Sequence, residues 1–401
     1  MARSGITRLQ NTQGESDRKH VCITFGRSFL TLDLARLLAA AGHKVTIVDS
    51  IPLAVTRFSN ATYDFYKTPS PKFQPREYCL ELARICREQK IDVVIPIHEE
   101  TDIISMMTDV FPPECTLFLS DFVIENGLHN KYDFQQLLAD RNIPTLRFAE
   151  LRSPEDVAAL DFTTPFALKQ CYSRGSQKVM KVYPGDPLTG LEFDPTNPWL
   201  AQEWLKGDKY CTYSVCHEGK VYAHATYPVR YAIDHNSCLT FESVEHQGIL
   251  DWVTDFIADI GFTGQVGFDF IENEERGLFT IECNPRATSG IMMFSPQDRV
   301  DRAFFGENDE IIFPDPYKRK MIGPGMLIYG WRKSARPPGV SLRQYVRDYW
   351  ETDDVITSFT DMRPAFMVPF AYANILRDCA KYHVGLAEGF MHDHEWDGVR
   401  I

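Results

Sequence analysis

The stretch that decides the fold reads Phe262-Thr-Gly-Gln-Val-Gly-Phe-Asp269-Phe-Ile271 and, after a short charged turn, Gly277-Leu-Phe-Thr-Ile-Glu282-Cys-Asn284-Pro-Arg286-Ala-Thr-Ser-Gly290. It predicts two strands joined by a polar turn at 272–277. Because side chains alternate faces along a strand, Glu282 and Asn284 share one face. A turn centred on 274 and 275 places Gly267 opposite Glu282, with Asp269 diagonally across on the same face, roughly 7–8 Å away.

Two carboxylates and an amide oxygen therefore converge just before Arg286. Hard oxygen donors of this kind suit Mg²⁺ that is shared with nucleotide phosphates. The alternative is a half-exposed strand with a solvated polar face. Val266, Phe268 and Phe270 provide an apolar face that fits both interpretations, so spacing alone leaves them open.

Bulk composition narrows the class of protein. The 401 residues predict two or three domains, and a hydrophobic content of 44% is that of an ordinary soluble protein. The formal net charge of −13 speaks against nucleic acid or a membrane as the main partner. No apolar run is long enough to span a bilayer. Residues 1–19 are polar and mixed in charge, which predicts a disordered leader.

The ten cysteines contain no Cys-x-x-Cys pair. In a chain of this length they are expected to be reduced, mostly buried thiols of a cytoplasmic protein, and a zinc or redox role is not favoured.

The amino-terminal part predicts a β-α-β unit: a strand at 21–25, a helix at 30–41 and a strand at 45–48. Its glycine turn lacks Gly-x-Gly-x-x-Gly, so a doubly wound structural or substrate-binding lobe is favoured over a dinucleotide site. A helix at 77–89 and a strand at 93–96 continue the pattern. His98, Glu99 and Glu100 follow that strand, at the edge where open α/β sheets bind ligands; a capped loop is the alternative.

Further elements are expected along the middle of the chain. They are helices at 132–140, from 153 and at 248–260, and strands at 165–169, 199–205, 210–216 and 220–226. Lys169 ends an apolar strand and precedes a small basic loop with Ser173, Gly175 and Ser176. Such a loop can close over phosphates, although an ordinary surface turn is the alternative. Glu203, Trp204 and Leu205 sit where backbone groups of a hinge could read an adenine edge.

The order of these elements resembles the ATP-grasp superfamily of ligases, nearest to its carbamoyl-phosphate-synthase-like and amino-acid-ligase branches. The residues that carry the resemblance run from Lys131 through Lys169 and Gln-Glu-Trp-Leu-Lys-Gly207 to Asp269 and Glu282-Cys-Asn-Pro-Arg286. The resemblance covers roughly residues 20–290. It implies an α/β (α+β) fold in which a doubly wound amino-terminal lobe precedes two α+β subdomains.

The expected boundaries are 1–19 for the leader, 20–125 for a pre-ATP-grasp Rossmann-like domain, 126–205 for the small lobe with its phosphate lid, 206–320 for the large lobe with the metal site, and 321–401 for a carboxy-terminal extension.

The resemblance also implies roles for individual residues. Lys131 and Lys169 would hold the phosphates of ATP, Ser173 to Ser176 would form the lid, and Glu203 to Leu205 the adenine hinge. Asp269, Glu282 and Asn284 would bind one or two Mg²⁺ ions, with Mn²⁺ as a substitute. Arg286, together with Lys169, would stabilise the transferring phosphoryl group. One departure is that Gly207 is followed by Asp208 and Lys209 rather than by a ribose-binding Glu.

The resemblance implies an ATP-dependent carboxylate–amine ligase that works through an acyl phosphate, with an amino acid as one substrate; a vinylogous acid could replace the carboxylate. Alternatives are phosphorylation of carbamate, a nucleotide-binding relic without catalysis, and a dehydrogenase. Candidate substrate contacts are His98, Glu99, Arg230, Ser289 and Gly290. A homodimer is expected from family analogy alone.

The tail after Pro324 is expected to mix short helices with Pro-rich loops. His392, His394 and Glu395 have the residue types of a metal site, but a solvated terminus is the expectation.

Overall fold

A computed structural model describes residues 18–173, 179–233, 237–316 and 318–401. The first domain is a five-stranded parallel sheet in the order β3-β2-β1-β4-β5. Its strands are β1 His20–Ile23, β2 Lys44–Asp49, β3 Asp64–Lys67, β4 Val93–Ile95 and β5 Thr116–Leu117, and its helices are α1 Phe29–Ala40, α2 Pro75–Gln89 and α3 Glu100–Ser105.

The two faces of this sheet are covered by different helices. Val21 and Ile23 of β1 pack with residues of α1, whereas Cys22 packs with residues of α2. Both faces are therefore buried, which explains why these strands read as continuous apolar runs. Helix α1 begins after Ser28, whose hydroxyl accepts a hydrogen bond from the amide of Leu30 at 3.2 Å. The predicted β-α-β unit is confirmed.

The second domain is an antiparallel sheet in the order β6-β9-β7-β8. It follows helices α4 Phe122–His129 and α5 Lys131–Asp140, and consists of β6 Phe148–Leu151, β7 Phe166–Gln170, β8 Met180–Val182 and β9 Trp199–Glu203, with α6 Pro154–Ala158. Helix α5 is capped by the Asn130 side chain, which accepts hydrogen bonds from the amides of residues 132 and 133.

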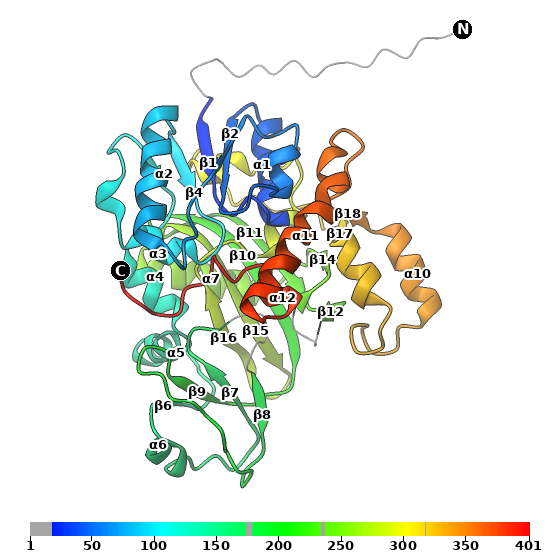
Figure 1. The fold of residues 1–401 in the computed structure, drawn as a ribbon. Coiled ribbons are helices and arrows are strands. Elements are labelled where there is room, and N and C mark those ends of the chain that lie inside the picture. The colour runs from blue at the N-terminus through cyan, green and yellow to red at the C-terminus, as the bar shows by residue number, and fades with distance from the viewer. Residues whose placement is uncertain (1–17, 174–178, 234–236, 317) are drawn as a thin grey trace.

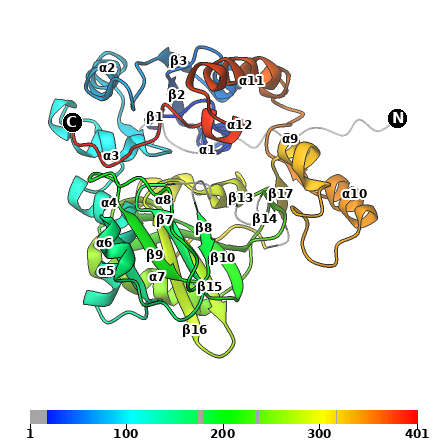
Figure 2. The same ribbon diagram turned by 60° about the horizontal axis from the view of Figure 1, so that its bottom comes forward.

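A second antiparallel sheet, in the order β11-β10-β15-β16, lies beside the first (Figures 1 and 2). Its strands are β10 Asp208–His217, β11 Lys220–Pro228, β15 Gly264–Asn273 and β16 Gly277–Asn284, and one face carries α7 Gln247–Ile260. Val253 and Phe256 of α7 pack with Val266 and Phe268 of β15. The apolar face predicted for the hairpin is thus core.

The remaining elements are β12 Ala232–Ile233, β13 Ser237–Cys238, β14 Thr240–Glu242, α8 Asp301–Phe304, β17 Arg319–Met321, α9 Gly323–Gly325, α10 Leu342–Glu351, β18 Asp353–Asp354, α11 Arg363–Tyr382 and α12 Leu386–Gly389. Helix α11 has 20 residues, so the expectation of only short helices after 324 was wrong. The guanidinium of Arg36 in α1 donates to the carbonyls of Val355 and Ile356, which joins this segment to the first domain.

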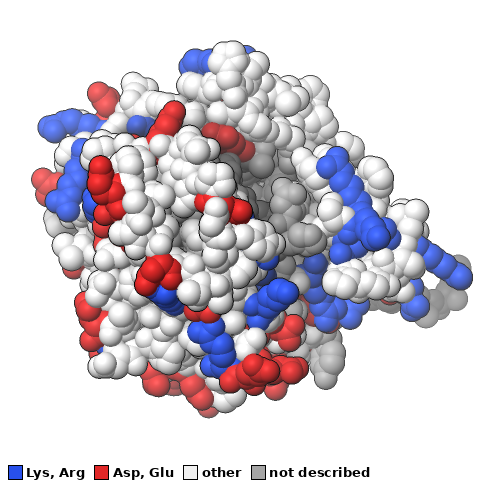
Figure 3. Space-filling view, turned by 90° about the horizontal axis from the view of Figure 1, so that it is seen from below, with Lys and Arg blue, Asp and Glu red and all other residues white. Residues whose placement is uncertain are grey.

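Charge is unevenly distributed over the surface. In Figure 3, basic side chains gather at the edge occupied by the segment around α10, while acidic and basic groups are mixed elsewhere. In the parts of the chain that the structure describes, no helix is long and apolar enough to cross a membrane.

Candidate functional site

The hairpin β15–β16 places the two predicted carboxylates directly opposite each other. Asn273 pairs with Gly277 and Phe270 with Thr280, and then a β-bulge at Ile281 shifts the register so that Asp269 pairs with Glu282 and Gly267 with Asn284. The predicted pairing of Gly267 with Glu282 was therefore wrong. Without the bulge, Ile281 would face Asp269; with it, both carboxylates lie on one face.

Two local features set this register. The Asn273 side chain accepts hydrogen bonds from the amides of residues 275 and 276, which forms an Asx turn, and Gly277 follows at a φ of 87°. The bulged residue is also in contact with the other sheet, because the carbonyl of Ile281 accepts a hydrogen bond from Nζ of Lys169 at 3.3 Å.

The paired carboxylates repel each other. Burial, followed by the charge of Glu282, raises the pKa of Asp269 to about 6. On the neighbouring strand β10, Cys211 lies opposite Asp269, and its thiol is hydrogen-bonded to that carboxylate. Oδ1 of Asn284 accepts a hydrogen bond from Nη2 of Arg286 at 2.9 Å.

This donor set fits a divalent cation that is shared with phosphates. Among the described residues there is no group of three or more His, Cys, Asp or Glu side chains able to hold a metal alone. Two facing carboxylates, Asp269 and Glu282, leave coordination positions for other oxygens, and a cation between them would relieve their repulsion.

Both predicted phosphate-binding lysines reach the hairpin, Lys131 from the start of α5 and Lys169 from β7. Nζ of Lys131 lies 3.5 Å from Oε1 of Glu282 and donates to the carbonyl of Ser173 at 2.5 Å. Burial lowers the pKa of Lys169 to about 8, with Glu282 opposing the shift and Lys131 adding to it. The lysines and carboxylates thus form one mixed-charge cluster between the two sheets.

The predicted lid is described only at its start. The hydroxyl of Ser173 donates to the carbonyl of Gln170 at 2.9 Å. Gly175 and Ser176 lie outside the described residues, so their predicted role stays a prediction.

The predicted hinge follows β9. The Glu203 carboxylate forms an ion pair with Arg276, whose hydrogen bond lowers the pKa of Glu203. The amide of Trp204 donates to the carbonyl of Pro165 at 2.9 Å, and Nζ of Lys181 lies 4.8 Å from the centre of the Trp204 ring. Leu205 comes next in the chain and is half-buried. Gln202 opens the predicted hinge stretch, although no role was assigned to it from the sequence. It is buried, and its Nε2 has no hydrogen-bond partner among the described residues.

Arg286 connects the β15–β16 hairpin with the first domain. Its Nε lies 3.9 Å from Oε1 of Glu99, which is only 1% exposed and lies directly before α3. His98 is also buried there, with its ring 5.0 Å from that of Phe25. The carboxyl edge of the parallel sheet and the β15–β16 hairpin therefore meet at these residues.

The other substrate candidates are less clearly placed. Arg230 is 48% exposed and pairs with Glu242 at 3.0 Å, and among the described residues no ion pair joins it to Asp269 or Glu282. Ser289 and Gly290 begin a short helical turn at Ser289–Met293. A Cβ on Gly290 would lie 2.4 Å from Cβ of Tyr213, so this glycine is needed for packing.

The carboxy-terminal tail, here the segment 390–401 that follows α12, departs most from expectation. His394 is fully buried and Glu395 is 4% exposed, so the expectation of a solvated terminus was wrong for both; His392 is half-buried. Figure 1 shows the tail crossing from α12 to α3 and α4. Nδ1 of His394 lies 3.2 Å from Oε2 of Glu100. Glu395 in turn lies 3.4 Å from Nζ of Lys72 and 3.5 Å from Nδ1 of His392, so partners within the fold account for the residue types that resembled a metal site.

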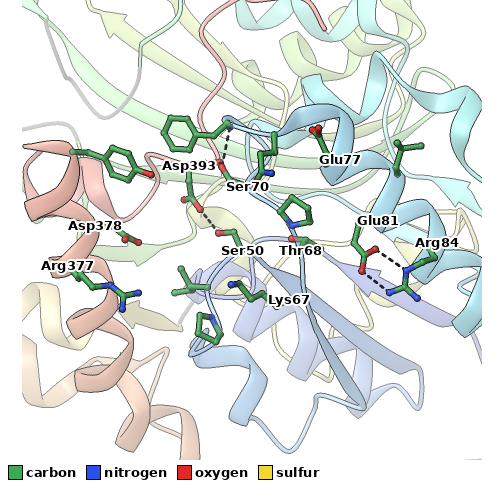
Figure 4. A pocket seen from close by; sticks show the side chains of 17 residues that line it. Ser50, Lys67, Thr68, Ser70, Glu77, Glu81, Arg84, Arg377, Asp378 and Asp393 are labelled. Carbon is green, nitrogen blue, oxygen red and sulfur yellow. Dashed lines mark hydrogen bonds and ion pairs between the residues drawn. The ribbon is translucent and has the colours of Figure 1, made fainter.

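A separate cavity of about 850 Å³ lies between the ends of β2 and β3 and helix α11 (Figure 4). Ser50, Thr68, Tyr382 and Asp393 are among its lining residues. None of the residues predicted to bind the nucleotide or the metal lines it, so it is not the predicted ATP site.

Comparison with known proteins supports the same assignment of the fold. Residues 128–290 match the family model described as an ATP-grasp domain. The structure resembles N5-carboxyaminoimidazole synthetase from Staphylococcus aureus complexed with ADP, with a TM-score of 0.61 and 13% identity over 83% of this chain and 96% of that one. A search of curated proteins found no match.

Two further solved structures are similar. L-amino acid ligase from Bacillus licheniformis has a TM-score of 0.54 and 14% identity over 75% of this chain and 78% of that one. The biotin carboxylase–βγ-ATP complex from Campylobacter jejuni has a TM-score of 0.55 and 13% identity over 73% of this chain and 71% of that one. At such identities the likeness concerns the fold.

Proposed function

The chain carries an ATP-grasp domain behind a parallel α/β domain, and we propose that it is an ATP-dependent ligase that joins a carboxylate to an amine. The observation that carries this proposal is the cluster in which Lys131 and Lys169 meet Asp269, Glu282 and Arg286. Cations that would bind phosphates and anions that would bind a metal lie side by side, as phosphoryl transfer requires.

In the proposed reaction, a substrate carboxylate attacks the γ-phosphate of ATP, which gives an acyl phosphate and ADP. The amine then displaces phosphate and forms the amide. Lys131 and Lys169 would bind phosphate oxygens, and Arg286 would stabilise the transferring phosphoryl group. Most of the rate enhancement would come from position and charge, so no nucleophilic side chain is needed.

Asp269, Glu282 and Asn284 would hold one or two divalent cations, Mg²⁺ in the first instance. A cation bound there would neutralise negative charge on the phosphates. Residues 173–176 would close over the phosphates and exclude water, which would otherwise hydrolyse the acyl phosphate.

An amino acid is the substrate we propose for one of the two positions. The support for this choice is that an L-amino acid ligase is among the similar structures.

The test is ADP release by the purified protein with Mg-ATP and amino acids crossed with simple carboxylic acids. We expect release only when both substrates are present, with a new amide detected by mass spectrometry. The Glu282→Gln variant should lose ADP formation, because a neutral amide binds the cation weakly. Normal turnover of that variant would contradict the metal assignment, and tight ATP binding without ADP release would indicate a nucleotide-binding relic.

A further inference from the structure

A buried chain of charges connects the first domain to Arg286. Nδ1 of His129 lies 2.9 Å from Oδ2 of Asp102, and Nε2 of the same ring lies 3.6 Å from Oε1 of Glu99. That Glu99 oxygen lies 3.9 Å from Nε of Arg286. Glu99 and Asp102 lie at the start of α3, His129 lies in α4 and Arg286 follows β16, so three parts of the chain meet in one network.

The signs of these charges alternate. Although burial opposes a charge on the imidazole, the carboxylates of Asp102 and then Glu99 raise the pKa of His129 to about 9. At neutral pH the protonated His129 therefore lies between the carboxylates of Asp102 and Glu99, and Glu99 lies between His129 and the guanidinium of Arg286. Asp102, His129 and Glu99 are all buried, where an uncompensated charge is costly, so each carboxylate depends on its neighbour.

The carboxy-terminal tail supplies a further contact to Glu99. The backbone amide of Trp396 donates to Oε2 of Glu99 at 3.0 Å. The Trp396 ring packs against Tyr172 at 5.0 Å and His129 at 6.0 Å between ring centres. The segment just before it is held by Asp393, whose carboxylate accepts hydrogen bonds from both terminal nitrogens of Arg27, at 2.9 and 3.0 Å.

Arg286 is oriented from several sides. Its Nη2 donates to Oδ1 of Asn284 at 2.9 Å and its Nη1 to the carbonyl of Ala287 at 3.3 Å, while Glu99 faces its Nε. A guanidinium has five N–H groups in a fixed plane, so these contacts determine where its remaining donors point.

We propose that Glu99, held by His129 and by the amide of Trp396, is a positioning residue for Arg286, and that the carboxy-terminal tail is thereby part of the active site. The inference rests on the proposed function, in which Arg286 meets the transferring phosphoryl group. Glu99 itself is too deeply buried to bind substrate directly, so it acts through the arginine.

The first experiment compares steady-state kinetics of Glu99→Gln and His129→Gln with the wild type. We expect kcat to fall about tenfold or more while KM for ATP changes less than twofold, since a small misplacement of a reacting group lowers the rate more than binding. His43→Gln is the matched control, because His43 is also buried beside an aspartate, at 3.5 Å from Asp301, and in the described part of the chain it forms no ion pair or hydrogen bond with Arg286. Its kcat should stay within twofold of the wild type.

A second pair of variants isolates the tail contact. Trp396→Ala keeps the backbone donor to Glu99 but removes the ring, whereas Trp396→Pro removes both. We expect a further fall in kcat from Ala to Pro, which a role of the ring alone would not produce. In addition, the ratio of the wild-type kcat to the kcat of His129→Gln should fall above about pH 9, as His129 loses its proton; the ratio removes the effect of ionisable groups that both proteins share, such as Lys169.

Hydrogen–deuterium exchange gives a readout that does not depend on turnover. Peptides spanning 284–290 should exchange faster in Glu99→Gln and in Trp396→Pro than in the wild type or His43→Gln. If the wild type forms no ADP with any substrate pair but this difference is seen, the ligase proposal fails while the link from the tail to Arg286 stands. Unchanged exchange and unchanged kcat in Glu99→Gln would overturn the inference.

Discussion

At the scale of single residues, the paired carboxylates show a conflict between stability and the proposed chemistry. Asp269 and Glu282 face each other on one hairpin, and burial together with Glu282 raises the pKa of Asp269. Like charges held together destabilise the protein without a cation. We therefore expect Asp269→Asn to be more stable than the wild type, by on the order of 1–2 kcal/mol in Mg²⁺-free buffer.

Differential scanning calorimetry with and without Mg-ADP would measure this difference. The wild type should gain thermal stability from Mg-ADP, and Asp269→Asn should gain much less. Equal stabilisation of both proteins by Mg-ADP would contradict the assignment of Asp269 to the metal.

His129 predicts a pH dependence of stability with a definite sign. Its pKa is about 9 in the folded protein and about 6.5 in an unfolded chain. Its stabilising contribution is therefore complete below pH 6.5 and is lost as the pH rises through 9. We expect the free energy of unfolding in urea to fall by on the order of 2–3 kcal/mol between pH 6.5 and 9.5, and by clearly less in His129→Gln.

The buried His224 provides a contrast within the same protein. Burial lowers its pKa to about 4, so this imidazole is neutral in the folded state. Its contribution is present above pH 6.5 and is lost as the pH falls, and it does not affect the alkaline range. An alkaline slope that is identical in His129→Gln and the wild type would show that another group is responsible.

At the scale of elements, the hairpin separates what the sequence could predict from what it could not. Alternation of apolar and polar residues was enough to identify both strands and the face of each acid. The pairing was not predictable, because a bulge at Ile281 inserts one residue into β16. At this bulge the carbonyl of Ile281 accepts a hydrogen bond from Lys169 of the neighbouring sheet. A contact between residues so far apart in the chain leaves no pattern in the local sequence.

Gly267 makes a prediction about the same hairpin. A Cβ there would lie 2.4 Å from Cγ2 of Thr288 and 2.6 Å from the carbonyl oxygen of Thr212. We expect Gly267→Ala to lower the free energy of unfolding by about 1–3 kcal/mol, because backbone of β10 must move. Chemical denaturation would measure the loss.

Gly127→Ala is the matched control. Gly127 lies inside α4, and a Cβ there would meet nothing within 4 Å. Alanine favours the helix over glycine, so this variant should gain up to about 1 kcal/mol. A loss at Gly127 of the same size as at Gly267 would argue against close packing as the cause.

At the scale of the whole molecule, the tail could not be predicted from its sequence. The order of elements up to residue 290 follows from periodicity, glycine turns and a family resemblance. The tail has no periodicity, and its partners lie about 300 or more residues away, such as Glu99 for Trp396 and Glu100 for His394. Charged residues at a chain end favour solvent unless the fold supplies partners, and only the assembled first domain supplies them.

Arg27 allows this long-range link to be measured. It is 1% exposed and bonds the carboxylates of Asp49 and Asp393, which come from the first domain and the tail. Removal of Arg27 leaves two carboxylates without their cation. We expect Arg27→Met to lower the free energy of unfolding by about 3–5 kcal/mol, as is usual when one partner of a buried ion pair is removed.

Asp393→Asn alone should lower the free energy of unfolding by less, because Arg27 still forms its ion pair with Asp49. The double variant should then recover part of the loss of Arg27→Met, since one stranded charge is gone, and a double-mutant cycle from urea denaturation gives the coupling free energy. Strictly additive losses would mean that the tail and the first domain are not coupled through Arg27, and that the tail is held by its other contacts alone.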